Sequence, residues 1–297
     1  MGIGGKVLKQ MCQVVFGGCP AEEAYHVMRR EVNQKLRVHY HGFLKERKGF
    51  YDGTYLPQER SKRIWTCWLQ GFDDAPELVK VCQNSLKKYI VDHELIQLTY
   101  ENYTQYVTLP EDIVQKYKKG KIPPALFSDL LRLEVLIQYG GTWMDATILC
   151  TGEHYPQEML DCDLFMFQAL RKGDNGFHGT SNWFITACSN NRLLLVLRDV
   201  LYQYWRDYDV TLNYYMFHDF FYSIAQLYPE DIAAMPRKNR LLPLALMQRM
   251  GYTYDPIWMN ELMKRCCFHK LNYRVSDAMK ANKNNFYHAV IESQYGS

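Results

Sequence analysis

The segment IPPALFSDLLRLEVLIQYGGTWMDATILC, residues 122–150, constrains the fold more than any other part of this 297-residue chain. It predicts a helix over residues 125–139, a turn at the following glycine pair and a strand over residues 142–150. Leu, Ile and Val fill both arms, so the strand is expected to be buried, yet it carries the carboxylate of Asp145. A buried carboxylate needs a cationic partner, a proton or a bound cation. The segment therefore predicts a functional site at Asp145.

Strand-like and helix-like segments alternate from residue 62 onwards. RIWTCWL and ELIQLTY predict strands, and between them Asp74 is predicted to cap a helix through ELVKVCQNSLKKY that has Pro76 in its first turn. A short helix is predicted over residues 110–119. This alternation is typical of a parallel sheet covered by helices, in which ligands bind beyond the carboxyl ends of the strands. We expect Asp145 to lie at such an end.

The rest of the chain is predicted to be mostly helical. DLFMFQA and NWFITA predict two further strands, and a strong helix is predicted over residues 191–205. The C-terminal third is expected to be helical, with a looser tail after residue 277. We therefore predict a polar, helical N-terminal appendage at residues 1–60 and one α/β domain at residues 61–297.

Composition and charge argue against several function classes. The net charge is only +3 and no dense Lys/Arg run is present, so no nucleic-acid partner is expected. Nine cysteines at irregular spacing match neither a disulfide framework nor a zinc site, which favours reduced thiols in the cytoplasm. No stretch approaches the roughly 18 apolar residues of a membrane span. We expect a soluble cytoplasmic protein, and a weak peripheral association with the inner face of the cell membrane stays open.

Polar side chains gather around the predicted turn. On the strand, Trp143, Asp145 and Thr147 are expected to share one face because side chains alternate with a period of two, which places a carboxylate beside a hydroxyl. On the preceding helix, Asp129 and Arg132 are three residues apart and share a face. They form either a surface ion pair of little energetic value or a pair that hydrogen-bonds neighbouring hydroxyls of a polar ligand.

The pattern SDLLRLEVLIQYGGTWMDAT resembles the sugar-binding and Asp-x-Asp region of retaining glycosyltransferases. These include capsular polysaccharide synthesis proteins, family 32 mannosyl- and galactosyltransferases and, more distantly, clostridial glucosylating toxins. Their shared form is an Asp-x-x-Arg helix followed by Gly-Gly-x-(Tyr/Trp)-x-Asp-x-(Asp/Thr). The resemblance covers residues 62–151 well and the remainder loosely. It is strongest to the capsular-synthesis branch, which also reads GG-x-W-x-DAT.

The resemblance implies a GT-A fold, which is a Rossmann-like mixed sheet flanked by helices, and a UDP- or GDP-linked sugar as the donor. Asp129 and Arg132 would hold hydroxyls of the donor sugar, and Asp145 would lie by the ribose and the metal-bound diphosphate. Trp68, at the end of the first strand, would either stack on the nucleobase or pack in the core. Asn182 would either approach the donor or acceptor or serve as a turn residue.

One position departs from the wider motif, because Thr147 stands where the second Asp of Asp-x-Asp is a direct metal ligand. Mn²⁺ or Mg²⁺ is still expected, since one or two carboxylates with phosphate oxygens and water can hold either ion. Asp145 and Thr147 would face it beside Trp143. His218 and Asp219 are candidates for a further ligand, with pairing or capping within a helix as the alternative. The ion would neutralise charge on the departing nucleoside diphosphate.

We therefore predict a retaining glycosyltransferase that moves a hexose from a nucleotide-diphospho-sugar to a hydroxyl of a polysaccharide or lipid-linked glycan, as in capsule biosynthesis. Its predicted catalytic residues are Asp145, Asp129 and Arg132. The alternative is a non-catalytic sugar-nucleotide-binding or scaffold protein of the same pathway, which Thr147 keeps open. Three further basic residues are interpreted as solvated charges, with contact to phosphates as the alternative: Arg171, Lys172 and Lys270.

Overall fold

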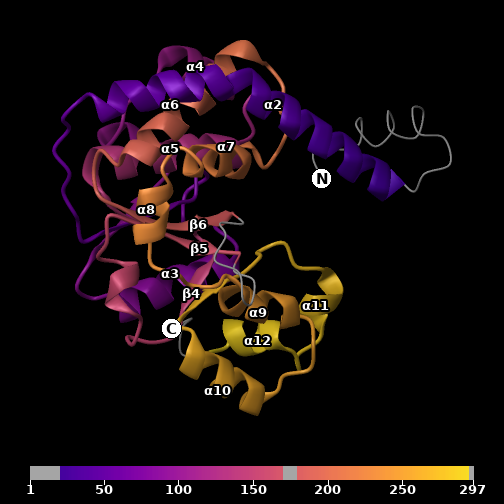
Figure 1. Cartoon of the computed structure of the whole chain (residues 1–297). Helices are drawn as coiled ribbons and strands as arrows, with labels where there is room; N and C mark the ends of the chain where they lie inside the picture. Colours follow the sequence, from indigo (N-terminus) through magenta and orange to yellow (C-terminus); the bar gives the residue numbers. More distant parts are fainter. Residues whose placement is uncertain (1–20, 170–178, 294–297) are drawn as a thin grey trace. The chain divides into compact units, whose positions relative to one another are not determined.

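The computed structural model describes residues 21–169 and 179–293, which fall into two compact units (Figure 1). The first unit comprises the described residues up to Tyr55, Leu109–Leu130 and Arg192–Pro229. The second comprises Leu56–Thr108 and the described parts of Leu131–Asn191 and Glu230–Ser297. The predicted domain border at residue 60 stays a prediction.

The first unit is built from helices. They are α2 (Ala21–Asp52), α4 (Glu111–Lys118), the first half of α5 (Pro124–Tyr139), α6 (Arg192–Asp207) and α7 (Met216–Ala225). α2 packs against α6 and α7, and α4 packs against α6 (Figure 1). The helices predicted over residues 110–119, 125–139 and 191–205 are confirmed.

One face of α2 and two of its tyrosines hold this helix against α6. Three buried side chains recur every four residues on that face: Leu36, Tyr40 and Leu44. The hydroxyl of Tyr40 donates a hydrogen bond to Asp207 (2.6 Å), and that of Tyr51 donates one to Asp199 (2.7 Å). Both carboxylates belong to α6. The helix predicted within the N-terminal segment is therefore confirmed from Ala21 onwards as part of a packed bundle.

The second unit holds a mixed five-stranded sheet in the order β2-β1-β3-β6-β5. Its strands are β1 (Arg63–Cys67), β2 (Glu94–Leu98), β3 (Gly141–Met144), β5 (Leu164–Gln168) and β6 (Thr180–Ala187). β1 runs parallel to β2 and β3, whereas β6 runs antiparallel to β3 and β5. A second sheet pairs β4 (Ile148–Cys150) with β7 (Phe268–Lys270) in antiparallel register. The predicted mixed α/β architecture is confirmed.

Helices complete the second unit. They are α3 (Glu77–Tyr89), the second half of α5, α9 (Leu241–Arg249), α10 (Pro256–Arg265), α11 (Asp277–Ala281) and α12 (Phe286–Ile291), with α8 (Pro229–Ala234) at the border of the units. Two short 3-10 turns lie at Tyr103–Gln105 and Gln157–Met159. α3 packs on β4, α9 packs on β7, and α12 packs on α3.

Two expectations about helix ends are wrong. Asp74 does not cap α3, because Pro76 occupies the N-cap position and its carbonyl accepts hydrogen bonds from the amides of Val79 and Lys80. The segment after residue 277 is not loose, because α11 and α12 form there. A side chain caps each of them: Ser276 accepts from the amide of Met279, and Asn285 accepts from that of His288.

The strand predicted over residues 142–150 is two strands. β3 ends at Met144 and β4 begins at Ile148, and the amide of Ile148 donates to the carbonyl of Asp145 (2.9 Å), which closes a turn. The break forms because the two arms belong to different sheets. β3 pairs with β1 and β6, whereas β4 pairs with β7. Trp143, Asp145 and Thr147 therefore do not alternate along one strand face, and Asp145 begins a turn.

The glycine pair before β3 fits its place tightly. Gly140 and Gly141 have φ angles of 65° and 98°, a region that favours glycine. A Cβ added to Gly141 would collide with the carbonyl oxygen of Arg63 on the neighbouring strand β1. Gly71 has a similar φ of 91°, but no atom lies within 4 Å of its added Cβ.

We predict that Gly141→Ala destabilises the protein more than Gly71→Ala. Backbone strain alone costs about 1–2 kcal/mol and applies to both variants. The collision in Gly141→Ala adds about 1–3 kcal/mol, as overpacking does elsewhere. Urea unfolding of both variants measures the difference. Equal losses of unfolding free energy would contradict the close approach between Gly141 and Arg63.

His269 on β7 is buried as a neutral imidazole. The side chain is fully buried, and its Nε2 lies 3.2 Å from the hydroxyl of Thr151. Burial lowers the pKa of His269 from 6.5 to about 4, because the charged imidazolium loses its hydration. Between these values the unfolded chain takes up a proton that the folded chain does not. This group's contribution to stability is therefore present above pH 6.5 and is lost as the pH falls towards 4.

We predict that His269→Gln flattens the pH dependence of unfolding between pH 6.5 and 4. The wild type should lose up to about 3 kcal/mol across this window through His269, and the variant should not. Urea midpoints measured along the window test the prediction. His41→Gln, at an exposed position on α2, is the control. An unchanged slope in His269→Gln would show that other groups cause the acid sensitivity.

Candidate functional site

Asp145 lies at the carboxyl end of β3, beside the carboxyl ends of the other parallel strands of the second unit. β1, β2 and β3 run in the same direction, so their carboxyl ends lie on one side of the sheet. The amide of Asp145 donates to the carbonyl of Trp183 on β6 (2.9 Å), which fixes the backbone at the start of the turn. The Asp145 side chain is 28% exposed. It is therefore held by the fold and still reachable from solvent.

Three side chains converge on the Asp145 carboxylate. Oδ1 accepts from Arg132 Nη2 (3.1 Å) and from Trp143 Nε1 (3.0 Å). Oδ2 lies 3.6 Å from the ammonium nitrogen of Lys270. These groups come from α5, β3 and β7. Two cations and an indole N–H therefore surround this carboxylate.

Arg132 and Asp129 line one stripe of α5 and are both buried, with exposed fractions of 4% and 7%. This burial excludes the surface ion pair that the spacing left open. The guanidinium of Arg132 also lies over the indole ring of Trp143, 4.8 Å from its centroid, which adds a cation–π contact. Arg132 therefore contacts Asp145 directly and also packs against Trp143, which donates to the same carboxylate oxygen.

Lys270 is not the solvated charge that the sequence suggested. Its side chain is 20% exposed, and its ammonium donates to the Thr147 hydroxyl (2.6 Å) and to the Leu271 carbonyl (3.0 Å). The reason is strand pairing, because β7 lies antiparallel to β4 and places Lys270 opposite Ile148, next to the turn. Arg171 and Lys172 lie outside the described residues.

The turn between the two sheets is also supported from α3. Gln83 is buried, and its Nε2 donates to the carbonyl of Ala146 (3.2 Å), while Gln97 Nε2 donates to Gln83 Oε1 (3.0 Å). The signal for Gln83 was a single amide among the apolar positions of α3, and sequence reasoning missed it. The backbone around Asp145 is therefore held by side-chain amides as well as by strand pairing.

Trp68 is half-buried directly after β1. Its ring meets that of Tyr273 edge to face, with centroids 4.9 Å apart, and packs against the small cluster that contains Ala146. Trp65, within β1, is fully buried in the core, and its Nε1 donates to the Gly140 carbonyl (2.9 Å). Asn182 is half-buried within β6, so its interpretation as a turn residue is wrong.

His218 and Asp219 lie on α7 of the first unit. Asp219 accepts a hydrogen bond from Arg37 Nη2 on α2 (3.0 Å) and another from Asn213. The His218 ring lies beside the rings of Tyr215 and Phe217. The alternative to a metal role was pairing or capping within a helix, but both of these partners of Asp219 lie outside α7. The role of His218 and Asp219 as metal ligands stays a prediction.

The donor set around Asp145 does not fit a divalent cation held by protein ligands alone. In residues 21–169 and 179–293, no group of three or more His, Cys, Asp or Glu side chains is placed to hold a metal. The Asp145 carboxylate is paired with two cations, and the Thr147 hydroxyl accepts from Lys270. The predicted Mn²⁺ or Mg²⁺ has no support from this geometry and stays a prediction.

Two buried cysteines of this unit offer no reactive thiolate. Burial raises the pKa of Cys82 on α3 and of Cys150 on β4 to about 12, so both thiols stay protonated at neutral pH. The chemistry available near Asp145 is therefore that of a fixed carboxylate, two cations and hydroxyl groups.

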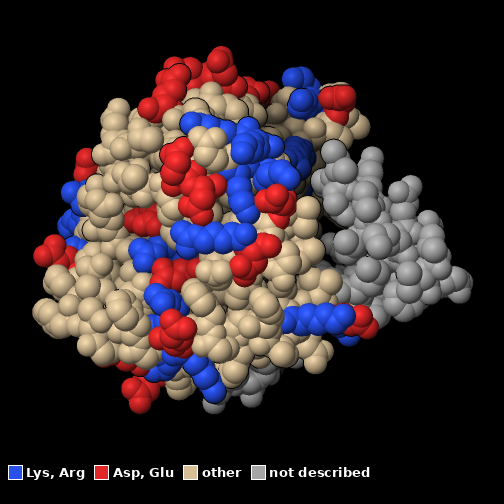
Figure 2. All heavy atoms as spheres, turned by 90° about the horizontal axis from the view of Figure 1, so that it is seen from above, with Lys and Arg blue, Asp and Glu red and all other residues tan. Residues whose placement is uncertain are grey.

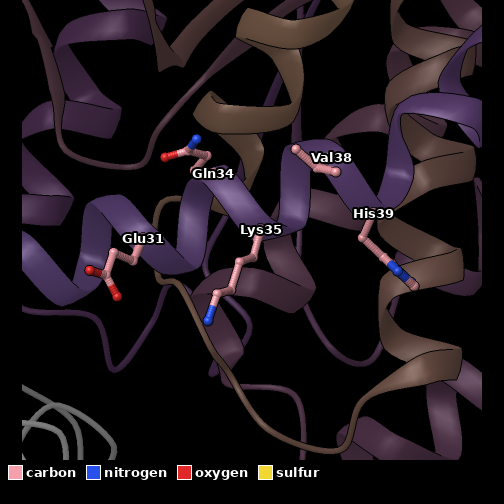
Figure 3. Close-up of a pocket in the computed structure, with 5 residues that line it drawn as sticks. All are labelled: Glu31, Gln34, Lys35, Val38 and His39. Atoms are coloured by element: carbon pink, nitrogen blue, oxygen red, sulfur yellow. The ribbon is translucent and has the colours of Figure 1, made fainter.

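The described surface of the first unit shows a hollow and interspersed charges. A hollow of about 510 Å³ follows one face of α2 (Figure 3) and is lined by Glu31, Gln34, Lys35, Val38 and His39. Acidic and basic side chains lie beside one another on the face in Figure 2, and Arg206 pairs with Asp112 (2.9 Å). Of the helices described, none is both long enough and apolar enough to cross a membrane.

Comparison with known proteins identifies the family of the chain. No curated protein sequence matches the chain. A solved structure described as "PaToxG Glycosyltransferase" is similar at 13% sequence identity and a TM-score of 0.39, covering 90% of this chain and 97% of that one. The model of the family described as "Capsular polysaccharide synthesis protein" matches residues 20–290. Since this match spans most of the sequence, the chain belongs to the family of capsular polysaccharide synthesis proteins.

Proposed function

We propose that the chain is a retaining glycosyltransferase of the GT-A type that transfers a hexose from a nucleotide-diphospho-sugar to a hydroxyl of a polysaccharide or lipid-linked glycan. One observation carries the proposal: a fixed, partly exposed carboxylate, Asp145, at the carboxyl edge of parallel strands. Family membership supports it, because building a capsular polysaccharide requires glycosidic bonds. We also propose that the chain is related to the family 32 glycosyltransferases that its sequence resembles.

The residues around Asp145 suit donor binding by position and charge. Arg132 and Trp143 hold the carboxylate in one orientation, so it is organised before a ligand arrives. In the proposed complex, Asp145 lies by the ribose and the metal-bound diphosphate, with Mn²⁺ or Mg²⁺ as the proposed ion. Asp129 and Arg132 contact hydroxyls of the sugar. The half-buried ring of Trp68 contacts the nucleobase. Asn182 and Thr147 also contact the donor in this proposal.

The proposed reaction breaks the bond between the anomeric carbon and the β-phosphate oxygen of the donor. The acceptor hydroxyl oxygen forms the new bond to the same carbon from the same face, which retains the configuration. Its proton passes to the leaving phosphate, so the products are the glycosylated acceptor and a protonated nucleoside diphosphate. No side chain has to act as a base, and the protein contributes orientation and charge stabilisation. The cytoplasmic location is part of the proposal.

We predict that one nucleotide class raises the melting temperature of the protein. A ligand at about a hundred times its dissociation constant adds roughly 2.7 kcal/mol, enough for a shift of several degrees in a chain of this size. The measurement is a thermal unfolding series with UDP-, GDP- and CDP-sugars, with and without Mn²⁺. No shift with any donor, in either condition, would contradict the proposed donor site.

We predict that Asp145→Asn abolishes transfer without unfolding the protein. The amide oxygen of Asn can still accept from Arg132 and Trp143, whereas the negative charge is lost. Removing one strong electrostatic contact of this kind costs about 3 kcal/mol, or more than 100-fold in rate. Transfer and donor hydrolysis are measured with the donor that the thermal series selects, and circular dichroism checks the fold.

Asp161→Asn is the matched control, because that carboxylate is 69% exposed and pairs with Arg60 at the surface. It should transfer at the wild-type rate. Full activity in Asp145→Asn would overturn the proposed site. Donor binding without any hydrolysis in the wild type would instead favour the sugar-nucleotide-binding scaffold.

A further inference from the structure

Lys270 has an unusual set of contacts for a largely buried ammonium group. Two acceptors in the described part of the chain lie within hydrogen-bond distance of its Nζ: the Thr147 hydroxyl and the Leu271 carbonyl. Both acceptors are neutral. An ammonium group has three N–H donors, so one remains for a ligand. The Lys270 side chain is 20% exposed, which leaves a path to it.

The charge of Lys270 is only partly compensated. Its carboxylate partner is Asp145, whose Oδ2 lies 3.6 Å away, beyond hydrogen-bond distance. The same carboxylate already accepts from Arg132 through Oδ1. Burying a charge without a close counter-ion is unfavourable, so an anionic ligand at this position would be stabilised by Lys270.

We propose that Lys270 binds the diphosphate of the donor. This inference rests on the proposed function and assigns a role to a residue for which the sequence left two alternatives, a solvated charge or a contact with phosphates. The position of Thr147 supports it, since the wider motif has an acidic metal ligand there, whereas here the hydroxyl accepts from Lys270 at 2.6 Å. A lysine binds phosphate as a compact point charge. In a site with a full Asp-x-Asp motif, the bound metal ion supplies positive charge to the diphosphate. Here Lys270 supplies positive charge.

The contribution of Lys270 grows as the donor bond breaks. Negative charge develops on the β-phosphate oxygen when it leaves the anomeric carbon, and a fixed cation beside it stabilises that charge. In this proposal Lys270 acts only as a positive charge, so it transfers no proton and forms no covalent bond. The acceptor proton leaves with the phosphate, as in the proposed reaction. Thr147 is then a positioning residue, because it holds the ammonium group.

The test compares binding of a nucleoside diphosphate with binding of its nucleoside, in EDTA, by calorimetry. UDP and uridine are used, or GDP and guanosine if the thermal series selects guanine. EDTA removes divalent cations, so that only side chains supply positive charge. Lys270→Met should weaken diphosphate binding by about 10- to 100-fold, the factor expected for losing one hydrogen bond to a charged group. Nucleoside binding should stay unchanged.

Two variants serve as controls, one that keeps the charge at position 270 and one that removes a lysine elsewhere. Lys270→Arg keeps the positive charge and should bind the diphosphate within a few-fold of the wild type. Lys264→Met removes a lysine that is 70% exposed on α10 and should bind like the wild type. Lys270→Gln, which keeps a donor for Thr147, replaces Lys270→Met if that variant does not fold.

Two results would overturn the inference while the proposed function survives. One is a neutral Lys270 variant that binds the diphosphate as tightly as the wild type. The other is that the wild-type protein, in EDTA, binds the nucleoside diphosphate no better than the nucleoside. The positive charge that binds the diphosphate would then come from a metal ion and not from Lys270. Failure of the proposed function looks different, because the wild type would then bind no nucleotide with or without Mn²⁺.

Discussion

The pairing of one carboxylate with two cations at a turn between two sheets constrains this part of the molecule. Asp145 accepts from Arg132 and faces Lys270, and these cations come from segments on either side of it in the sequence. Each of the three charges is at least partly buried and would be unfavourable alone. Their arrangement therefore ties α5, β3 and β7 to one another, and the packing of those elements fixes the geometry of the charges in return.

The backbone of the turn is anchored as firmly as the charges. Each of its three residues is held by a different element: the amide of Asp145 by β6, the carbonyl of Ala146 by Gln83 of α3, and the carbonyl of Thr147 by the amide of Leu271 after β7. The turn has little freedom to move when a ligand binds. A rigid turn suits a site whose contribution is electrostatic, because the charges need no rearrangement during the reaction.

Sequence reasoning succeeded where the deciding interactions are local. The helix α5 and the glycine pair at its end follow from residues within one short segment, and the shared face of Asp129 and Arg132 follows from helical spacing. It failed where pairing between distant segments decides. The break of the strand at Asp145 depends on β4 pairing with β7, and the Thr147–Lys270 contact joins residues 123 positions apart. No periodicity in either segment encodes such a pairing.

Thr147 and Lys270 are best understood as one arrangement. A divalent cation at the Asp145 carboxylate would share Oδ2 with an ammonium group 3.6 Å away, and the two like charges would repel each other in a partly buried setting. An acidic residue in place of Thr147 would add a negative charge that Lys270 would neutralise, leaving less positive charge for a phosphate. A hydroxyl instead orients the ammonium group and leaves its charge in place. The departure from the Asp-x-Asp pattern that the chain resembles is therefore compatible with the proposed anion site, because the Lys270 ammonium lies at the Thr147 hydroxyl.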